Sequence, residues 1–117
     1  MPGPQVPYVE VVVDASLITD WETCHDVFSE TFGFPDWCGR NMNAWIDCMT
    51  SLDKPDDKLS RVHAPSGGIL VLRIDNAKDF ASRCPEQYAA IVECASFVNW
   101  RRRDCDEAPV IALSFFK

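Results

Sequence analysis

The most chemically suggestive stretch of this sequence lies between residues 36 and 47. Trp37 and Gly39 fall in a segment of turn-forming residues, and Asn43 and Asp47 follow at a spacing of four residues. Four residues are about one helical turn, so both polar side chains would lie on one face of a helix. An exposed aromatic ring beside hydrogen-bond acceptors is typical of residues that dominate a protein interface. The alternative interpretation is that Trp37 packs into the core and that Asn43 and Asp47 are solvated.

Residue combinations typical of catalysis are sparse. Nothing in the sequence pairs His25 or His63 with a nucleophilic cysteine or serine. Gly67-Gly68 precedes a predicted strand, which is the wrong end for a loop that binds phosphate. We therefore predict that the protein is not an enzyme. An enzyme would need a pocket that holds a perturbed cysteine or histidine, and Cys38 is the first candidate.

The cysteine pattern indicates reduced thiols. The six are Cys24, Cys38, Cys48, Cys84, Cys94 and Cys105, and none forms a Cys-x-x-Cys pair that would indicate a zinc site. The chain is long enough to build a core, so it does not need disulfides. Several of the cysteines fall on apolar helix positions, where a free thiol acts as a small hydrophobic group. We predict buried or half-buried free thiols and neither a metal ion nor another cofactor.

Charge is concentrated in the first third of the chain. Of 117 residues, 11 are Lys or Arg and 18 are Asp or Glu, which gives a formal charge of −7. Residues 1–39 contain no Lys or Arg, and the acidic and basic residues balance from Arg40 onward. The excess of acidic over basic residues argues against binding to nucleic acid or to an anionic membrane, and it would attract a basic protein. The alternative is an acidic surface that only aids solubility.

No segment indicates export or insertion into a membrane. The sequence lacks an apolar run of the roughly 18–20 residues that span a bilayer. Its N-terminus has no basic region followed by an apolar stretch, as a signal peptide would. We expect a cytoplasmic protein.

Three apolar stretches are predicted strands: Tyr8–Val13, Ile69–Asp75 and Pro109–Phe116. Because Tyr8–Val13 is almost entirely apolar, we expect it to be covered on both faces. Four predicted helices separate the strands, at residues 19–33, 41–52, 76–83 and 85–103. The first has Thr19 and Glu22 as a capping box and ends at Gly33, the second begins at Asn41, and Pro85 opens the last.

The order β-α-α-β-α-α-β predicts a small α/β domain. Strands separated by helices need crossover connections, which give a mostly parallel sheet, here of three strands with helices packed on it. We expect residues 8–117 to form one domain and residues 1–7, with three prolines, to form a loose leader. Three arginines in the last turn of the final helix suit the negative end of its dipole.

The segment from Phe34 to Met49 resembles the barstar family of ribonuclease inhibitors. The positions that match the family pattern directly are Pro35, Asp36, Gly39, Asn41, Ala44 and Asp47. The resemblance implies a parallel sheet covered by helices, and it implies inhibition by occlusion. In this family, the loop and helix plug the active site of a small ribonuclease, and an acidic side chain takes the place of the RNA phosphate. The expected partner is therefore a basic ribonuclease or ribonuclease-type toxin, and we expect a monomer when it is unbound.

The resemblance also implies roles for single residues. Asp47 matches the aspartate that mimics phosphate, and Trp37 matches an aromatic that covers the catalytic region of the enzyme. Glu93 on the last helix corresponds to a secondary acidic contact. The expected partner-binding residues are Asp36, Trp37, Gly39, Asn41, Met42, Asn43, Ile46, Asp47 and Glu93.

The sequence departs from the family pattern at four positions. Asn43 stands where the family has a second helix aspartate, and Cys38 replaces the second loop aromatic. Trp45 and Ile46 exchange the usual aliphatic-then-aromatic order. These differences leave open a second hypothesis, in which the same fold is a regulatory or scaffold module with a partner that is not a nuclease.

Overall fold

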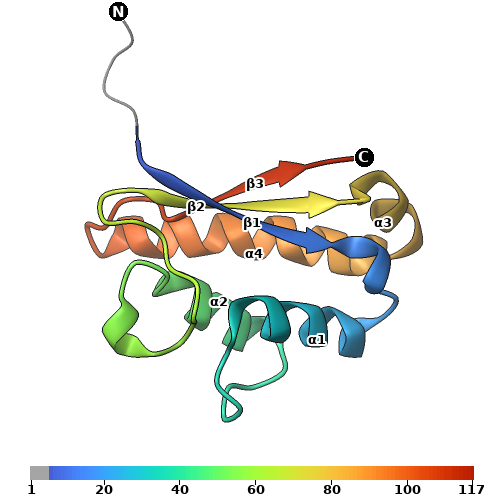
Figure 1. Ribbon diagram of the computed structural model, residues 1–117, viewed down its shortest axis with the longest axis horizontal. Coiled ribbons are helices and arrows are strands. Elements are labelled where there is room, and N and C mark those ends of the chain that lie inside the picture. Colours follow the sequence, from blue (N-terminus) through green and yellow to red (C-terminus); the bar gives the residue numbers. More distant parts are fainter. Residues whose placement is uncertain (1–5) are drawn as a thin grey trace, which may run out of the picture.

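The computed structural model describes residues 6–117, which form a three-stranded sheet and four α-helices (Figure 1). In chain order these are β1 (Tyr8–Asp14), α1 (Trp21–Phe32), α2 (Met42–Thr50), β2 (Ile69–Asp75), α3 (Ala77–Arg83), α4 (Pro85–Asp104) and β3 (Ile111–Phe115). The strands lie in the order β1-β2-β3, and both neighbouring pairs are parallel. The predicted fold class and element order are confirmed.

The predicted leader lies largely outside the described residues, which begin at residue 6. At its end, the carbonyl oxygen of Pro7 accepts a hydrogen bond of 3.0 Å from the amide of Ile69. Gly68 is required at this point, because a Cβ there would lie 2.1 Å from the same Pro7 oxygen. The chain before β1 is therefore joined to the sheet from Pro7 onward.

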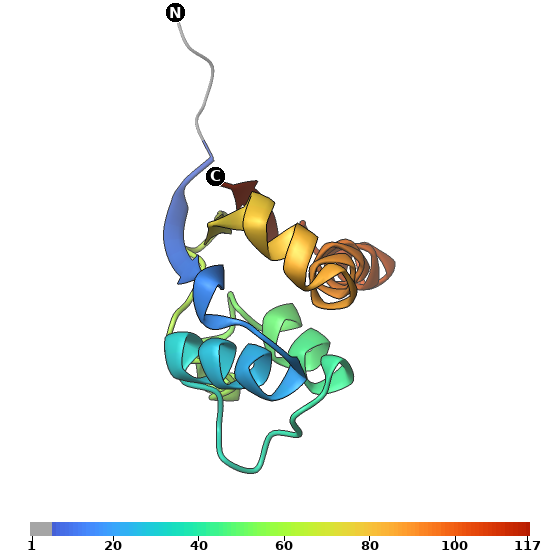
Figure 2. The same cartoon turned by 90° about the vertical axis from the view of Figure 1, so that its right-hand side faces the viewer.

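All four helices lie on one side of the sheet (Figure 2). The strands consequently alternate in burial: Leu70, Leu72 and Ile74 of β2 are fully buried, and the side chains between them are half-buried. The prediction that β1 is covered on both faces is wrong. Val13 faces the core, whereas Tyr8 on the opposite face is 66% exposed. A sheet of three strands with helices on one face leaves the other face open, whatever the composition of its edge strand.

The start of α1 differs from the prediction by one residue. Asp20, not Thr19, is the N-cap: its carboxylate accepts a hydrogen bond of 2.8 Å from the amide of Thr23. The Thr23 hydroxyl accepts one of 3.0 Å from the amide of Asp20, which completes the capping box. The predicted end is correct, since Gly33 has φ of 68° and its amide donates to the carbonyl of Ser29.

Replacing Asp20 with alanine should lower the urea midpoint of unfolding, because the amide of Thr23 loses its acceptor. Thr19→Ala is the matched control. The Thr19 hydroxyl makes only a 3.3 Å contact with the Thr23 hydroxyl, so the urea midpoint should fall clearly less in this variant. Equal midpoint shifts in the two variants would contradict the assignment of Asp20 as the cap.

Side-chain packing fixes α2 between its neighbours. Trp45 on α2 meets Phe28 of α1 edge to face, with ring centroids 5.7 Å apart. On its other side, α2 lies along α4, where Arg102 is 4% exposed. The Arg102 guanidinium donates two hydrogen bonds of 2.8 Å to the Asp53 carboxylate and one of 2.9 Å to the carbonyl of Thr50. These contacts hold α2 against α4 and leave one face of α2 at the surface.

Candidate functional site

Loop 34–41, the segment between α1 and α2, presents the expected aromatic residue to solvent. A turn closes when the amide of Cys38 donates to the carbonyl of Pro35 at 2.9 Å. Trp37 lies within this turn and is 75% exposed, the largest exposed fraction among the large hydrophobic side chains of the described residues. The alternative interpretation, in which Trp37 packs into the core, is therefore wrong.

The residues after Trp37 attach the loop to both helices. Asn41 is the N-cap of α2, and its side chain accepts a hydrogen bond of 2.8 Å from the amide of Ala44. A Cβ at Gly39 would lie 2.9 Å from the side-chain nitrogen Nδ2 of Asn41, so glycine leaves room for the side chain that caps α2. Arg40 holds the other side, donating to the carboxylate of Asp26 at 2.6 Å and to the carbonyl of Glu22 at 3.0 Å.

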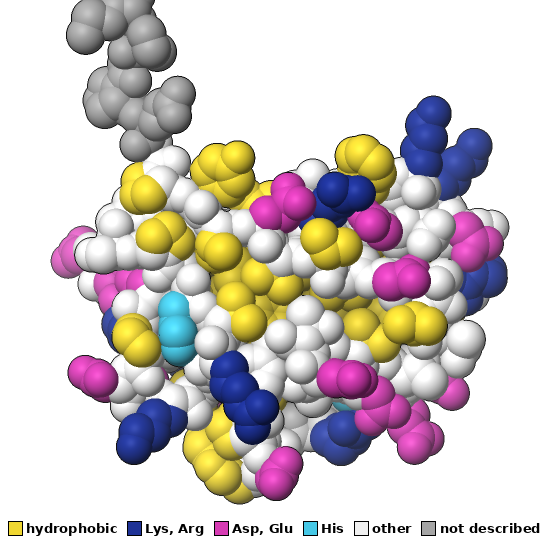
Figure 3. Space-filling view, viewed as in Figure 1, with side chains coloured by type: hydrophobic (Ala, Val, Ile, Leu, Met, Phe, Trp, Pro, Cys, Tyr) yellow, Lys and Arg dark blue, Asp and Glu magenta, His cyan; other side chains and the backbone are white. Residues whose placement is uncertain are grey.

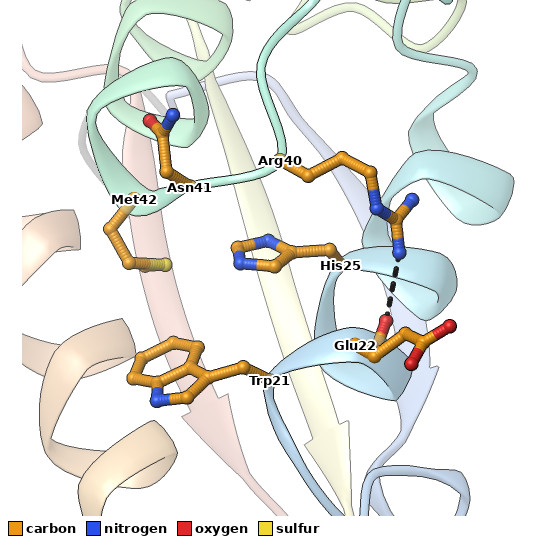
Figure 4. Close-up of a pocket in the computed structure, with 6 residues that line it drawn as sticks. All are labelled: Trp21, Glu22, His25, Arg40, Asn41 and Met42. Atoms are coloured by element: carbon orange, nitrogen blue, oxygen red, sulfur yellow. Dashed lines mark hydrogen bonds between the residues drawn. The ribbon is translucent and has the colours of Figure 1, made fainter.

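An open pocket of about 440 Å³ lies between α1 and the start of α2 (Figure 4). The rings of Trp21 and His25 stack in it with centroids 5.8 Å apart, and Met42 lies opposite them. Burial lowers the pKa of His25, and the nearby Arg40 guanidinium lowers it further. The pocket therefore favours neutral His25 and offers an apolar surface beside Asn41.

Four of the expected partner-binding residues lie on a second surface, where α2 meets α4. Asn43 and Ile46 of α2 line a concavity of about 310 Å³ together with Glu93, Cys94 and Phe97 of α4. Asp47 lies one turn after Asn43 and is also exposed. The structure thus brings Glu93 to the same surface as three α2 residues, although about fifty positions separate them in sequence.

The carboxylate of Asp47 is already paired with a cation, Arg101 of α4. The two side chains form an ion pair of 2.7 Å in which Asp47 is 61% exposed and Arg101 is 46% exposed. From the sequence, Arg101 was expected only at the negative end of the dipole of the last helix, and its contact with Asp47 was not predicted. Phe97 and Trp100, which are 44% and 55% exposed and have ring centroids 5.5 Å apart, were not predicted to belong to this surface either.

The signal for these residues was present in the spacing of α4. Positions 93, 97 and 100 fall on the helix face opposite its buried residues Ile91, Ala95 and Val98, and position 101 is exposed on the flank between the two faces. Two aromatic residues on that outer face indicate an exposed patch once the core face is assigned. We name the surface formed by Asn43, Ile46, Asp47, Glu93, Phe97, Trp100 and Arg101 the α2–α4 face.

The acidic residues of the first third do not form one patch. Asp26, Glu30 and Asp36 line an open concavity of about 550 Å³ beside loop 34–41, together with Arg61. Glu10 lies on the sheet instead, 3.7 Å from Arg73. Figure 3 shows acidic side chains spread around one face of the molecule, with hydrophobic side chains across its central band. The excess charge next to the loop therefore comes mainly from α1 and from Asp36.

Comparison with models of known protein families identifies the family to which this fold belongs. A family model described as Barstar (barnase inhibitor) matches residues 8–111, from the start of β1 to the first residue of β3. The chain belongs to the barstar family. The match includes loop 34–41 and the whole α2–α4 face. No individual curated protein matches the sequence.

The barstar family consists of inhibitors that have no catalytic activity of their own, and the description of the family names barnase as the target. In this barstar-family chain, no three His, Cys, Asp or Glu side chains within residues 6–117 are grouped as ligands for a metal ion. None of the helices in that range has the length and apolar composition to cross a membrane. All six cysteines are free thiols: Cys24, Cys48 and Cys84 are buried, Cys38 and Cys94 are half-buried, and Cys105 is exposed.

Proposed function

We propose that this protein binds a small basic ribonuclease or ribonuclease-type toxin and blocks its active site with loop 34–41 and α2. The observation that carries the proposal is the exposure of Trp37, because an indole that is 75% exposed on a helix-anchored loop suits insertion into a partner. Asp47, on the exposed face of the helix that follows, supplies a carboxylate in place of an RNA phosphate. The protein itself performs no reaction and acts in the cytoplasm as a monomer.

Charge beside the loop supports a basic partner. Asp26, Glu30 and Asp36 line the concavity beside loop 34–41, so a nuclease site lined by Arg and Lys would be attracted to this end of the molecule. Such steering accelerates association and weakens as salt rises. The acidic face that only aids solubility would show neither effect.

Calorimetric titration against barnase and other small basic ribonucleases, at low and high salt, tests the proposal. We expect a tight complex with at least one of them, weaker binding at high salt, and loss of RNA cleavage in the complex. Binding without loss of cleavage would contradict occlusion of the active site. No binding to any ribonuclease of the panel would contradict a ribonuclease as the partner.

The α2–α4 face favours a second candidate function, that of a scaffold module with a different protein partner. Asp47 already has a cation at 2.7 Å in Arg101, and Asn43 adds no charge. Phe97 and Trp100 add exposed aromatic area. A partner that fits this face would carry an acceptor for Arg101 as well as a cation for Asp47.

Replacing Arg101 with glutamine distinguishes the two candidates. If Asp47 contacts nuclease cations, removing Arg101 frees the carboxylate and removes a repulsive charge, so affinity for a bound ribonuclease should rise about three- to tenfold. Arg103→Gln makes the same charge change on an exposed residue without an ion pair to any of residues 6–117, and its effect should be smaller. Weaker binding by Arg101→Gln would favour the scaffold function.

A further inference from the structure

Two thiols meet behind loop 34–41. The sulfur atoms of Cys38 and Cys48 lie 2.9 Å apart, with Cys38 half-buried in the loop and Cys48 fully buried in α2. A disulfide bond is about 2.0 Å long, so the two sulfurs need to approach by only about 0.9 Å. Cys38 directly follows Trp37 and Cys48 directly follows Asp47. A bond between them would join the two segments that carry the proposed binding residues.

Cys38 and Cys48 are in contact with each other, and Cys38 is accessible from solvent. Their hydrogen bond is the one bond between two thiols within the described residues. Cys24 and Cys84 are both buried, and the Cys84 thiol donates to the carbonyl of Ile18 at 3.6 Å instead. Cys105 is exposed but has no thiol partner in residues 6–117. A small oxidant can reach Cys38, and a second thiol lies directly behind it.

We propose that Cys38 and Cys48 are a redox pair that closes to an intramolecular disulfide by exchange with a low-molecular-weight disulfide such as oxidised glutathione. The thiolate of Cys38 attacks one glutathione sulfur, which breaks the glutathione disulfide, forms a mixed disulfide and releases one glutathione thiolate. Cys48 then gives its proton to solvent and attacks the Cys38 sulfur, which releases the second glutathione. The two protein thiols are oxidised by two electrons, and one glutathione disulfide is reduced to two thiols.

The second step controls the rate of closure. Burial raises the pKa of the Cys48 thiol, and the hydrogen bond to Cys38 raises it further. Cys48 therefore keeps its proton in the reduced protein and becomes the slow, resolving thiol. Closure should accelerate as pH rises, because the fraction of Cys48 thiolate increases.

Closure would fix loop 34–41 in the arrangement that the structure shows. The required shift of the sulfurs is small, and Asn41 and Arg40 already attach the other end of the loop to α2 and α1. An added covalent link behind Trp37 reduces the freedom of the loop, which favours binding through pre-organisation. This consequence for binding rests on the proposed function, whereas the disulfide itself does not.

Peptide mapping after treatment of the reduced, folded protein with oxidised glutathione tests the pair. We expect loss of two hydrogens and a cross-linked peptide that contains Cys38 and Cys48. Cys105 is the internal control, since it is exposed and should carry glutathione as a stable adduct. A glutathione adduct that persists on Cys38, or no reaction of Cys38 while Cys105 reacts, would overturn the proposal.

Two variants separate the steps. Cys48→Ala should stop at a glutathione adduct on Cys38, and Cys38→Ser should leave residue 48 unmodified because its thiol is buried. Because Cys38 is half-buried in a loop, the Cys38→Ser variant should fold. It therefore remains a valid test even if Cys48→Ala disturbs α2. Modification of Cys48 in the Cys38→Ser variant would overturn the assignment of Cys38 as the attacking thiol.

Binding of the oxidised and reduced forms is measured separately. Against a ribonuclease that binds the reduced protein, the oxidised form should dissociate about threefold more slowly. Faster dissociation would contradict pre-organisation by the disulfide. If neither form binds any ribonuclease, the proposed function fails, and the redox pair is still decided by the peptide map.

Discussion

Replacing Asp47 with alanine is expected to weaken binding to the partner ribonuclease by about 2 kcal/mol or more, which is about thirtyfold in Kd. Asp47 is exposed on α2 and pairs with Arg101, which is itself 46% exposed. Exposed ion pairs contribute little to stability, so the carboxylate can exchange Arg101 for cations of the partner. Once it is buried among guanidinium groups, its removal leaves those charges without a counter-charge, which is the main cost of the substitution.

Asp57→Ala is the matched control for this prediction. Asp57 is an exposed aspartate in the one-turn helix Pro55–Asp57, so the variant loses the same charge away from loop 34–41 and the α2–α4 face. Both changes lower the net negative charge by one, so the difference between the two variants measures the effect of the position of the charge. Titration calorimetry at two salt concentrations gives the affinity of each variant and its dependence on salt. Equal losses of affinity in the two variants would contradict the placement of Asp47 at the centre of the interface.

The elements were predictable because their signals are local. Ile69–Asp75 is predicted and observed with the same bounds, since a short apolar run that contains β-branched residues and directly follows two glycines favours a strand over a helix. Asn41 and Gly33 were predicted correctly as caps because each is preceded or followed by a clear periodic segment. The cap of α1 was misplaced because Thr19 and Asp20 are both good caps, and only the backbone geometry decides between adjacent candidates.

The relations between elements were less accessible. Tyr8–Val13 has the composition of a buried strand, yet the number of strands and the side taken by the helices leave one of its faces open. The pairing of Asp47 with Arg101 depends on the alignment of α2 along α4, and the contact between Cys38 and Cys48 depends on the path of loop 34–41. No sequence period encodes a contact between side chains on different elements.

The largest loss of stability is expected from Arg102→Met. Arg102 is 4% exposed and donates to both oxygens of the Asp53 carboxylate, to the carbonyl of Thr50 and, at 2.6 Å, to the carbonyl of Ala108. Methionine retains much of the apolar stem but leaves these acceptors without donors. Removing one partner of a buried ion pair typically costs about 3–5 kcal/mol, and we expect the lower end because Asp53 is 28% exposed.

Urea denaturation measures this loss, with Arg103→Met as the control on the next residue of α4, which is exposed. Arg103→Met should change the free energy of unfolding by less than about 0.5 kcal/mol. Comparable losses in the two variants would show that the contacts of Arg102 with Asp53 and the carbonyls do not hold α2 to α4.

The same ion pair should give the stability a defined dependence on pH. The hydrogen bonds from Arg102 lower the pKa of Asp53 below its ordinary value in the folded protein. A carboxyl with a lowered folded pKa stabilises the fold above its unfolded pKa of about 4, and this contribution is lost as pH falls through the folded pKa. The difference in unfolding free energy between the native protein and Arg102→Met should therefore be constant near neutral pH and shrink on acidification below about pH 4. A difference that stays constant down to strongly acidic pH would mean that packing of the Arg102 stem, and not its charge, holds the two helices together.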